Sequence, residues 1–190
     1  SKNRIRGKLI WFHCSSVGEL LSIIPIIEKL ELNSKVNQIL LTTTTLSSSK
    51  IFKTLNLKKT VHQFFPIDNN FILNKFLNYW KPSTVFLCES EIWPNLINTI
   101  HKKKIKLILI NARMTFKSFR RWKKIKFFSN EIFKKFDLCF TQNNETQKRL
   151  KLLGISKIYN LGNLKFATSK KVKKDILEEE TLNFFKKKKI

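Results

Sequence analysis

The sequence predicts an α/β fold, a Rossmann-like parallel sheet with helices on both faces. Short apolar runs alternate with longer helical segments seven times along the chain. Such alternation at short spacing is typical of βαβ units. The length of 190 residues suits one domain with a core of its own. No apolar run approaches the roughly 20 residues that span a bilayer.

The predicted strands are short apolar runs rich in branched and aromatic residues. They cover residues 9–12, 38–41, 61–65, 84–88, 105–110, 137–141 and 157–161. Because these runs are apolar throughout, we expect buried strands in a sheet that is covered on both faces.

The predicted helices lie between these strands, at residues 20–32, 47–57, 70–80, 94–103, 113–126 and 145–153. Asp68 is the expected N-cap of the helix over 70–80. Pro94 fits the first turn of the next helix. Gly154 is the expected C-cap of the last one.

The first strand leads through a small-residue turn into the first helix. Ser15, Ser16 and Gly18 allow a tight turn with free backbone N–H groups at the helix start. Glu19 follows at the positive end of the helix dipole, which favours a charged carboxylate. On this stretch alone, a glutamate that only complements the dipole is the better interpretation.

Other polar loops follow the carboxyl ends of later strands, where open α/β sheets bind ligands. Glu89 and Glu91 are two apart, so along a strand they would face the same side and converge on one cleft. Trp93 is interpreted as a core residue or helix anchor. The remaining rim positions are Thr42–Thr45, Asn111–Arg113, Gln142 and Asn163. One polar cleft built from separate loops is therefore predicted.

The chain is strongly basic, with 38 basic and 13 acidic residues and a net charge of +25. This balance indicates a polyanionic partner, either nucleic acid or an anionic membrane. The strongest basic and aromatic stretch predicts reversible membrane docking, with a solvated, half-buried helix as the alternative. Its members are Arg113, Lys117, Arg120, Arg121, Lys123, Lys124 and Lys126, interleaved with Phe116, Phe119, Trp122 and Ile125.

Several kinds of site are not indicated. The three cysteines Cys14, Cys88 and Cys139 have no CxxC spacing, which predicts reduced thiols and neither a disulfide framework nor a metal site. Cys14 as a nucleophile is poorly supported, because the adjacent His13 would point to the other side of the strand. A Rossmann glycine fingerprint and a phosphate-binding loop are absent from the sequence, so we expect no cofactor.

Taken together, ordered motifs from about residue 10 to residue 166 resemble the N-terminal half of the bacterial Kdo transferases. These enzymes add 3-deoxy-D-manno-octulosonic acid (Kdo) from its CMP-activated form to a lipid A precursor. The matching blocks are Trp11–Glu19, Thr42–Thr45, Phe65–Asp68, Glu89–Asn95, Asn111–Arg113 with Ser118, Gln142, and Gly162–Phe166.

The resemblance implies a GT-B architecture, in which two Rossmann-like domains face a cleft and the N-terminal one binds the acceptor. It implies that Glu19 is the general base of an inverting transfer, with Glu89 and Glu91 as further catalytic carboxylates. A single displacement needs one base, whereas a retaining double displacement also needs a nucleophile. The expected substrate-binding residues are Ser16, Gly18, Thr43, Thr44, Asn111, Arg113, Ser118, Arg120, Arg121, Gln142, Asn163 and Lys165.

The resemblance also implies domain organisation, partners and location. We expect residues 1–166 to form the acceptor-binding domain and residues 167–190 a charged helix or linker toward a missing C-terminal donor domain. The expected partners are CMP-Kdo, mainly through that domain, the lipid A precursor lipid IVA, and the anionic inner-membrane surface, with no nucleic acid. The expected location is the cytoplasmic face of the bacterial inner membrane, peripheral or anchored by a missing N-terminal segment. The isolated chain is expected to be inactive.

The sequence departs from the family pattern at a few positions. Cys14 and Ser15 stand where an Ala-Val pair is usual, and Ala167 replaces an Asp. Two alternatives stay open: a non-catalytic fragment that binds acceptor or anionic lipid, and a basic nucleic-acid-binding module. The Glu-rich loops argue against the second, because they would repel phosphates at the edge where a ligand binds.

Overall fold

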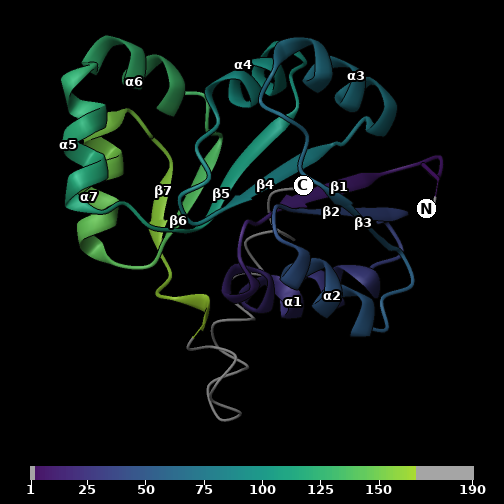
Figure 1. Cartoon of the computed structure of the whole chain (residues 1–190). Helices are drawn as coiled ribbons and strands as arrows, with labels where there is room; N and C mark the ends of the chain where they lie inside the picture. Colours follow the sequence, from purple (N-terminus) through teal and green to yellow (C-terminus); the bar gives the residue numbers. More distant parts are fainter. Residues whose placement is uncertain (1–2, 166–190) are drawn as a thin grey trace.

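A parallel sheet of seven strands is the centre of the computed structural model, which describes residues 3–165 (Figure 1). Its order is β3-β2-β1-β4-β5-β6-β7, which confirms the predicted α/β class. The strands are β1 Leu9–His13, β2 Gln38–Thr43, β3 Thr60–Phe64, β4 Thr84–Cys88, β5 Lys106–Ala112, β6 Leu138–Thr141 and β7 Ile158–Asn160.

The strand order reverses between β1 and β4, which lie side by side in the sheet. The chain winds outward from β1 through β2 to β3, and then returns to β4 on the other side of β1. In open α/β sheets the crevice at such a reversal is the usual place for a ligand. The loops after β1 and β4 are therefore the first place to look for a site.

The helices lie between the strands and cover both faces of the sheet. Figure 1 shows α1 and α2 on one face and α3 to α7 toward the other. Their bounds are α1 Val17–Glu31, α2 Leu46–Thr54, α3 Asn70–Trp80, α4 Pro94–Lys102, α5 Phe116–Lys124, α6 Lys126–Phe133 and α7 Asn144–Leu153. The predicted charged helix or linker over 167–190 lies outside the described residues.

Alternating side chains of the strands build a separate core on each face. In β1, Leu9 and Trp11 pack into the core covered by α3, α4, α6 and α7. Ile10, Phe12 and Cys14 pack into the core covered by α1. Each fully buried large apolar side chain contributes about 1.5–3 kcal/mol relative to exposure, so both faces hold the sheet in place.

Two sequence-based details of the helices are wrong. The basic stretch predicted as one helix over 113–126 is helical only over α5, which ends at Lys124 because Ile125 is not helical (φ −109°, ψ 51°). A further helix that was not predicted, α6, begins at Lys126. Asn69, not Asp68, caps α3, and its side chain accepts from the N–H of Phe71 at 2.9 Å. Asp68 instead accepts from the N–H of Leu96 at 2.8 Å, so it secures the start of α4.

The predicted C-cap of the last helix is confirmed. Gly154 follows α7 with φ of 121°, a left-handed conformation that glycine adopts without a steric cost.

Candidate active site

The β1–α1 loop places Glu19 at the sheet edge through a capping arrangement. Ser16 is the N-cap of α1, and its side chain accepts from the N–H of Glu19 at 3.2 Å. The Glu19 carboxylate in turn accepts from the Ser15 N–H at 2.8 Å and from the Ser16 hydroxyl at 3.0 Å. These contacts fix the carboxylate against the first turn of the helix.

Glu19 is more enclosed than the dipole argument predicts, with only 9% of the residue exposed. Burial raises the pKa of its carboxyl above the ordinary value, and the nearby charges of Glu91 and Glu89 raise it further. The hydrogen bonds from Ser15 and Ser16 act in the opposite direction. The net effect is a carboxylate with increased proton affinity at the switch point of the sheet.

The β4–α4 loop places Glu91 opposite, with both oxygens bonded. One oxygen accepts from the Ser15 hydroxyl at 2.6 Å. The other accepts from Trp93 Nε1 at 2.6 Å and faces His13 Nε2 at 3.2 Å. Burial acts to raise the pKa of Glu91, but the bonds from His13, Ser15 and Trp93 outweigh it, and the pKa is lowered.

His13 connects Glu91 to the strand below it. The ring is fully buried and stacks on Phe65 with centroids 3.8 Å apart. A carboxylate only accepts hydrogen bonds, so His13 Nε2 carries the proton that points to Glu91. Its Nδ1 lies 3.0 Å from Thr42 Oγ1, which also accepts from Trp11 Nε1 at 2.9 Å.

Glu89 lies in the turn that follows β4, not on the strand. Its φ of 52° is left-handed, so the expectation that strand alternation brings Glu89 and Glu91 to one side is wrong. Glu89 and Glu91 still lie near Glu19, because the β4–α4 loop and the β1–α1 loop follow neighbouring strands. Glu89 forms an ion pair with Lys165 Nζ at 2.7 Å. The Lys165 side chain also lies beside Gly18, since a Cβ atom at that position would be 3.6 Å from Lys165 Nζ.

Buried amides hold the segment after β7 against the same edge. Asn111, 2% exposed and with φ of 50°, accepts from the N–H of Leu164 at 3.1 Å. Gln142 donates to the carbonyl of Asn111 at 2.9 Å. Asn163 lies 3.5 Å from Gln142 and accepts from the N–H of Lys165 at 3.0 Å. These predicted rim residues are thus brought together, and their contacts position Lys165.

The two predicted threonines differ in exposure. Thr43 is fully buried, and its hydroxyl lies 2.8 Å from His62 Nε2. Thr44 is exposed and donates to the carbonyl of Ser15 at 3.0 Å. Thr44 is therefore the one that lies at the open edge, beside Ser15.

The remaining predicted residues lie on and before α5. Arg113 is exposed, and its N–H donates to the carbonyl of Glu89 at 3.2 Å. Ser118 is half-buried on α5, while Arg120 and Arg121 are exposed there. The Arg120 guanidinium lies 5.9 Å from the centre of the Phe116 ring. These cations form a surface next to the site and not part of the carboxylate cluster.

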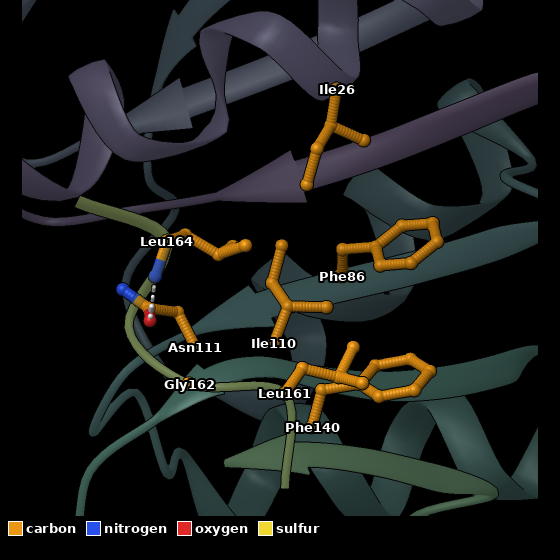
Figure 2. A pocket seen from close by; sticks show the side chains of 8 residues that line it. All are labelled: Ile26, Phe86, Ile110, Asn111, Phe140, Leu161, Gly162 and Leu164. Carbon is orange, nitrogen blue, oxygen red and sulfur yellow. Dashed lines mark hydrogen bonds between the residues drawn. The ribbon is translucent and has the colours of Figure 1, made fainter. Parts of the chain in front are cut away.

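An apolar pocket lies on the α1 side of the sheet, between Ile26 of α1 and the strand residues Phe86, Ile110 and Phe140 (Figure 2). Asn111 links it to the polar edge through the hydrogen bond to Leu164 drawn in Figure 2. Among residues 3–165, no cluster of His, Cys, Asp and Glu could hold a metal ion. The same residues include no helix long and apolar enough to cross a membrane.

The cysteines are buried thiols. Cys14, Cys88 and Cys139 are all fully buried, and burial raises the pKa of each well above its ordinary value. A raised pKa disfavours the thiolate, so the geometry gives no support to Cys14 as a nucleophile.

Sequence reasoning missed the roles of His13, Ser15 and Trp93 as partners of Glu91. No spacing links His13 or Ser15 to Glu91, since they are 78 and 76 positions away, and the two-residue separation of Glu91 and Trp93 does not by itself indicate a hydrogen bond. A signal did exist for Glu19: Ser16 and Glu19 have the Ser-x-x-Glu spacing of a capping box.

Comparison with solved structures defines the class of fold. Residues of this chain superpose on UDP-GlcNAc 2-epimerase from Neisseria meningitidis with a TM-score of 0.59 and 13% identity, over 94% of this chain and 54% of that one. The UDP-N-acetylglucosamine 2-epimerase from Rickettsia bellii gives a TM-score of 0.59 and 15% identity, over 93% and 52% of the two chains. The chain therefore has the α/β Rossmann-like fold of one half of a GT-B protein.

Comparison of sequences identifies the family. The family model of 3-deoxy-D-manno-octulosonic-acid transferase (kdotransferase) matches residues 1–168. The 3-deoxy-D-manno-octulosonic acid transferase of Rickettsia bellii is 41% identical over 162 residues, covering 85% of this chain and 38% of the relative. That of Haemophilus influenzae is 30% identical over 159 residues, covering 83% and 37%. The chain belongs to the Kdo transferase family, as the motifs predicted, and it spans less than two fifths of the length of these relatives.

Proposed function

We propose that this chain is the acceptor-binding part of a Kdo transferase that moves Kdo from CMP-Kdo to a lipid A precursor, lipid IVA, in lipopolysaccharide inner-core synthesis. The observation that carries the proposal is the Glu19 carboxylate, held at the switch point with a raised pKa beside Glu89 and Glu91. The family supports the transferred sugar.

In this mechanism Glu19 is the general base. A hydroxyl of the acceptor attacks the anomeric carbon of Kdo, and Glu19 takes the hydroxyl proton as the new C–O bond forms. The bond from that carbon to the CMP phosphate breaks, and CMP leaves with the bonding electrons. One displacement inverts the anomeric configuration and needs no nucleophilic carboxylate. A raised pKa suits this role, because a base works best when its pKa approaches the working pH.

The donor side of the site is assigned to a second domain. The relatives are more than twice as long as the matched segment, and the GT-B fold has two such halves. We infer that CMP-Kdo binds mainly to the other half, and that residues 3–165 alone do not transfer Kdo.

The test is Glu19→Gln in the full-length protein, measured as Kdo transfer from CMP-Kdo to lipid IVA. Glutamine keeps the shape and the cap but accepts no proton, so transfer is expected to fall by about 10²–10⁴-fold. Glu28→Gln is the matched control, because Glu28 is exposed on the same helix. Near-normal transfer by the Glu19→Gln protein would contradict the proposal. It would favour the alternative, a fragment that binds acceptor or anionic lipid, in which Glu19 only caps α1.

The surface of α5 and α6 is proposed to contact the anionic cytoplasmic face of the inner membrane. Exposed aromatic residues lie there among the cations, with Phe116 60% exposed and Phe127 85% exposed. Arg120 and Arg121 are exposed beside them. Each basic residue near an anionic bilayer contributes about 1 kcal/mol, so the surface supports peripheral, reversible binding.

Reversal of Arg120 and Arg121 to Glu tests this contact. Binding to vesicles that contain anionic lipid is expected to weaken roughly 30-fold or more, at about 1 kcal/mol per residue. Reversal of Lys102 and Lys104, at the end of α4, gives a control of the same net charge. Equal weakening in both proteins would show that only net charge matters and would remove the local docking surface.

A further inference from the structure

Ser15 joins three loops of the site through its three polar groups. Its hydroxyl donates to Glu91 at 2.6 Å, and its backbone N–H donates to Glu19 at 2.8 Å. Its carbonyl accepts from the Thr44 hydroxyl at 3.0 Å. The loops after β1, β2 and β4 therefore meet at this one residue.

Glu91 is fixed independently of Ser15. Trp93 Nε1 donates to it at 2.6 Å, and His13 Nε2 lies at 3.2 Å on the same oxygen. His13 is itself held, since its ring is fully buried against Phe65. Glu91 is thus an anchored acceptor, and the Ser15 hydroxyl is tied to it.

We propose that Ser15 and Glu91 are positioning residues that keep the Ser15 N–H on the carboxylate of Glu19, and that Glu91 does not take the substrate proton. The inference rests on the proposed role of Glu19 as the base. It reassigns Glu91, for which the family resemblance implied a catalytic role. Glu91 accepts from three protein donors, two of them on one oxygen, whereas Glu19 accepts from two, one on each oxygen. The more heavily bonded carboxylate has less capacity left to accept the proton of a reacting hydroxyl.

The consequence for Glu19 follows from its surroundings. The groups around its carboxylate are Glu89 and Glu91, the thiols of Cys14 and Cys88, and the Lys165 ammonium beside Gly18. Against burial and two negative charges, the Ser15 N–H is a contact that lowers the pKa of Glu19. A loosened Ser15 therefore moves the pKa of Glu19 further upward, without any change in the charges nearby.

The first test is Ser15→Ala in this chain, followed by amide hydrogen exchange and ¹³C NMR of the carboxyl groups. The alanine keeps the backbone N–H and loses only the hydrogen bond from the Ser15 hydroxyl to Glu91, which we call the tether. Exchange of the residue 15 amide is expected to speed up about fivefold, the effect of one hydrogen bond, and the pKa of Glu19 is expected to rise. Ser83→Ala is the control, because the Ser83 hydroxyl donates to Leu9 O at 3.0 Å at the opposite edge of the sheet. Unchanged exchange and titration after Ser15→Ala would overturn the proposal.

The second test asks whether Ser15 acts through Glu91. Glu91→Met keeps an unbranched side chain without an acceptor oxygen, and in that background Ser15→Ala is expected to have no further effect on the amide. Equal effects in both backgrounds would contradict the tether. If Glu91→Met does not fold, Ser15→Thr replaces it: a retained hydroxyl should preserve slow exchange, and exchange as fast as in Ser15→Ala would overturn the proposal.

The third readout is transfer by the full-length protein. Ser15→Ala is expected to lower kcat about fivefold with KM unchanged, the signature of a misplaced base rather than lost binding. An equal fall in kcat for Ser83→Ala would show a general stability effect and count against the tether. If the wild-type protein transfers no Kdo, the proposed function fails, while the exchange and titration results still decide the tether.

Discussion

Glu19 and Glu91 lie on neighbouring loops of one sheet edge, yet their environments set their pKa values apart. Glu19 is capped by two donors and buried between two other carboxylates, and its pKa is raised. Glu91 has three donors, one of them the imidazole of His13, and its pKa is lowered. Burial opposes the charged form of both. The number and kind of donors decide the direction in which each pKa is shifted.

This difference in pKa separates two roles, proton transfer and positioning, whereas the sequence analysis expected both residues to be catalytic carboxylates. A carboxylate with spare acceptor capacity and a raised pKa suits proton transfer. A carboxylate that accepts from three protein donors, as Glu91 does, suits the positioning of its neighbours. Pairs of titratable groups pushed apart in this way are a general sign of divided roles at an active site.

The largest expected effect comes from breaking the more heavily bonded side of the pair. Glu91→Ala leaves three donors without their acceptor: the buried His13 ring, the half-buried Trp93 ring and the Ser15 hydroxyl. The free energy of unfolding is therefore expected to fall by about 3 kcal/mol. Denaturant unfolding measures it. Glu145→Ala is the control, since Glu145 pairs with Arg149 at the surface with 76% of its side chain exposed, and such pairs contribute below about 1 kcal/mol. Equal losses in the two proteins would mean that the bonds to Glu91 add nothing.

A smaller and opposite effect is expected at Glu19. Because its pKa is raised in the folded state, the ionised carboxylate destabilises the fold above that pKa, and the penalty disappears as the pH falls below the unfolded value of about 4.3. Glutamine carries no charge, so the Tm of Glu19→Gln should equal or exceed that of the wild type at pH 7. Thermal unfolding between pH 7 and pH 4 should show the difference shrinking. A difference that grows in acid would contradict the raised pKa.

The smallest effect is expected at the third carboxylate, Glu89. The Lys165 side chain is 41% exposed, whereas that of Glu89 is 10% exposed. Because solvent reaches the ammonium group, it screens the ion pair, and Lys165→Met should cost less than about 1 kcal/mol in unfolding free energy. Lys35→Met, at an exposed position outside the site, controls for the lost charge. A loss of 2 kcal/mol or more, by the same measure, would place Lys165 among the structural residues of the edge, because exposed ion pairs contribute only about 1 kcal/mol at most.

Much of the local structure could be predicted because the chain signals it locally. The strand over 84–88 and the helix over 70–80 have the expected bounds, since Pro82 and Trp80 separate an apolar run from an amphipathic one. Most other ends moved by one to three residues, and α6 was not predicted at all. A cap such as Thr115 or a break such as Ile125 depends on backbone conformation. The convergence of Glu89 and Glu91 was expected for the wrong reason, strand alternation.

The sequence by itself determined the alternation of strands and helices, the family, and the polar character of the loops at the carboxyl ends. These follow from local periodicity and from short motifs. Only the tertiary structure decided how many donors each carboxylate has, because His13 and Ser15, which end or follow β1, reach Glu91 in the loop after β4. Strand order places β1 beside β4. Hydrogen bonding and desolvation depend on distance in space and not on separation in sequence, so local patterns do not reveal them.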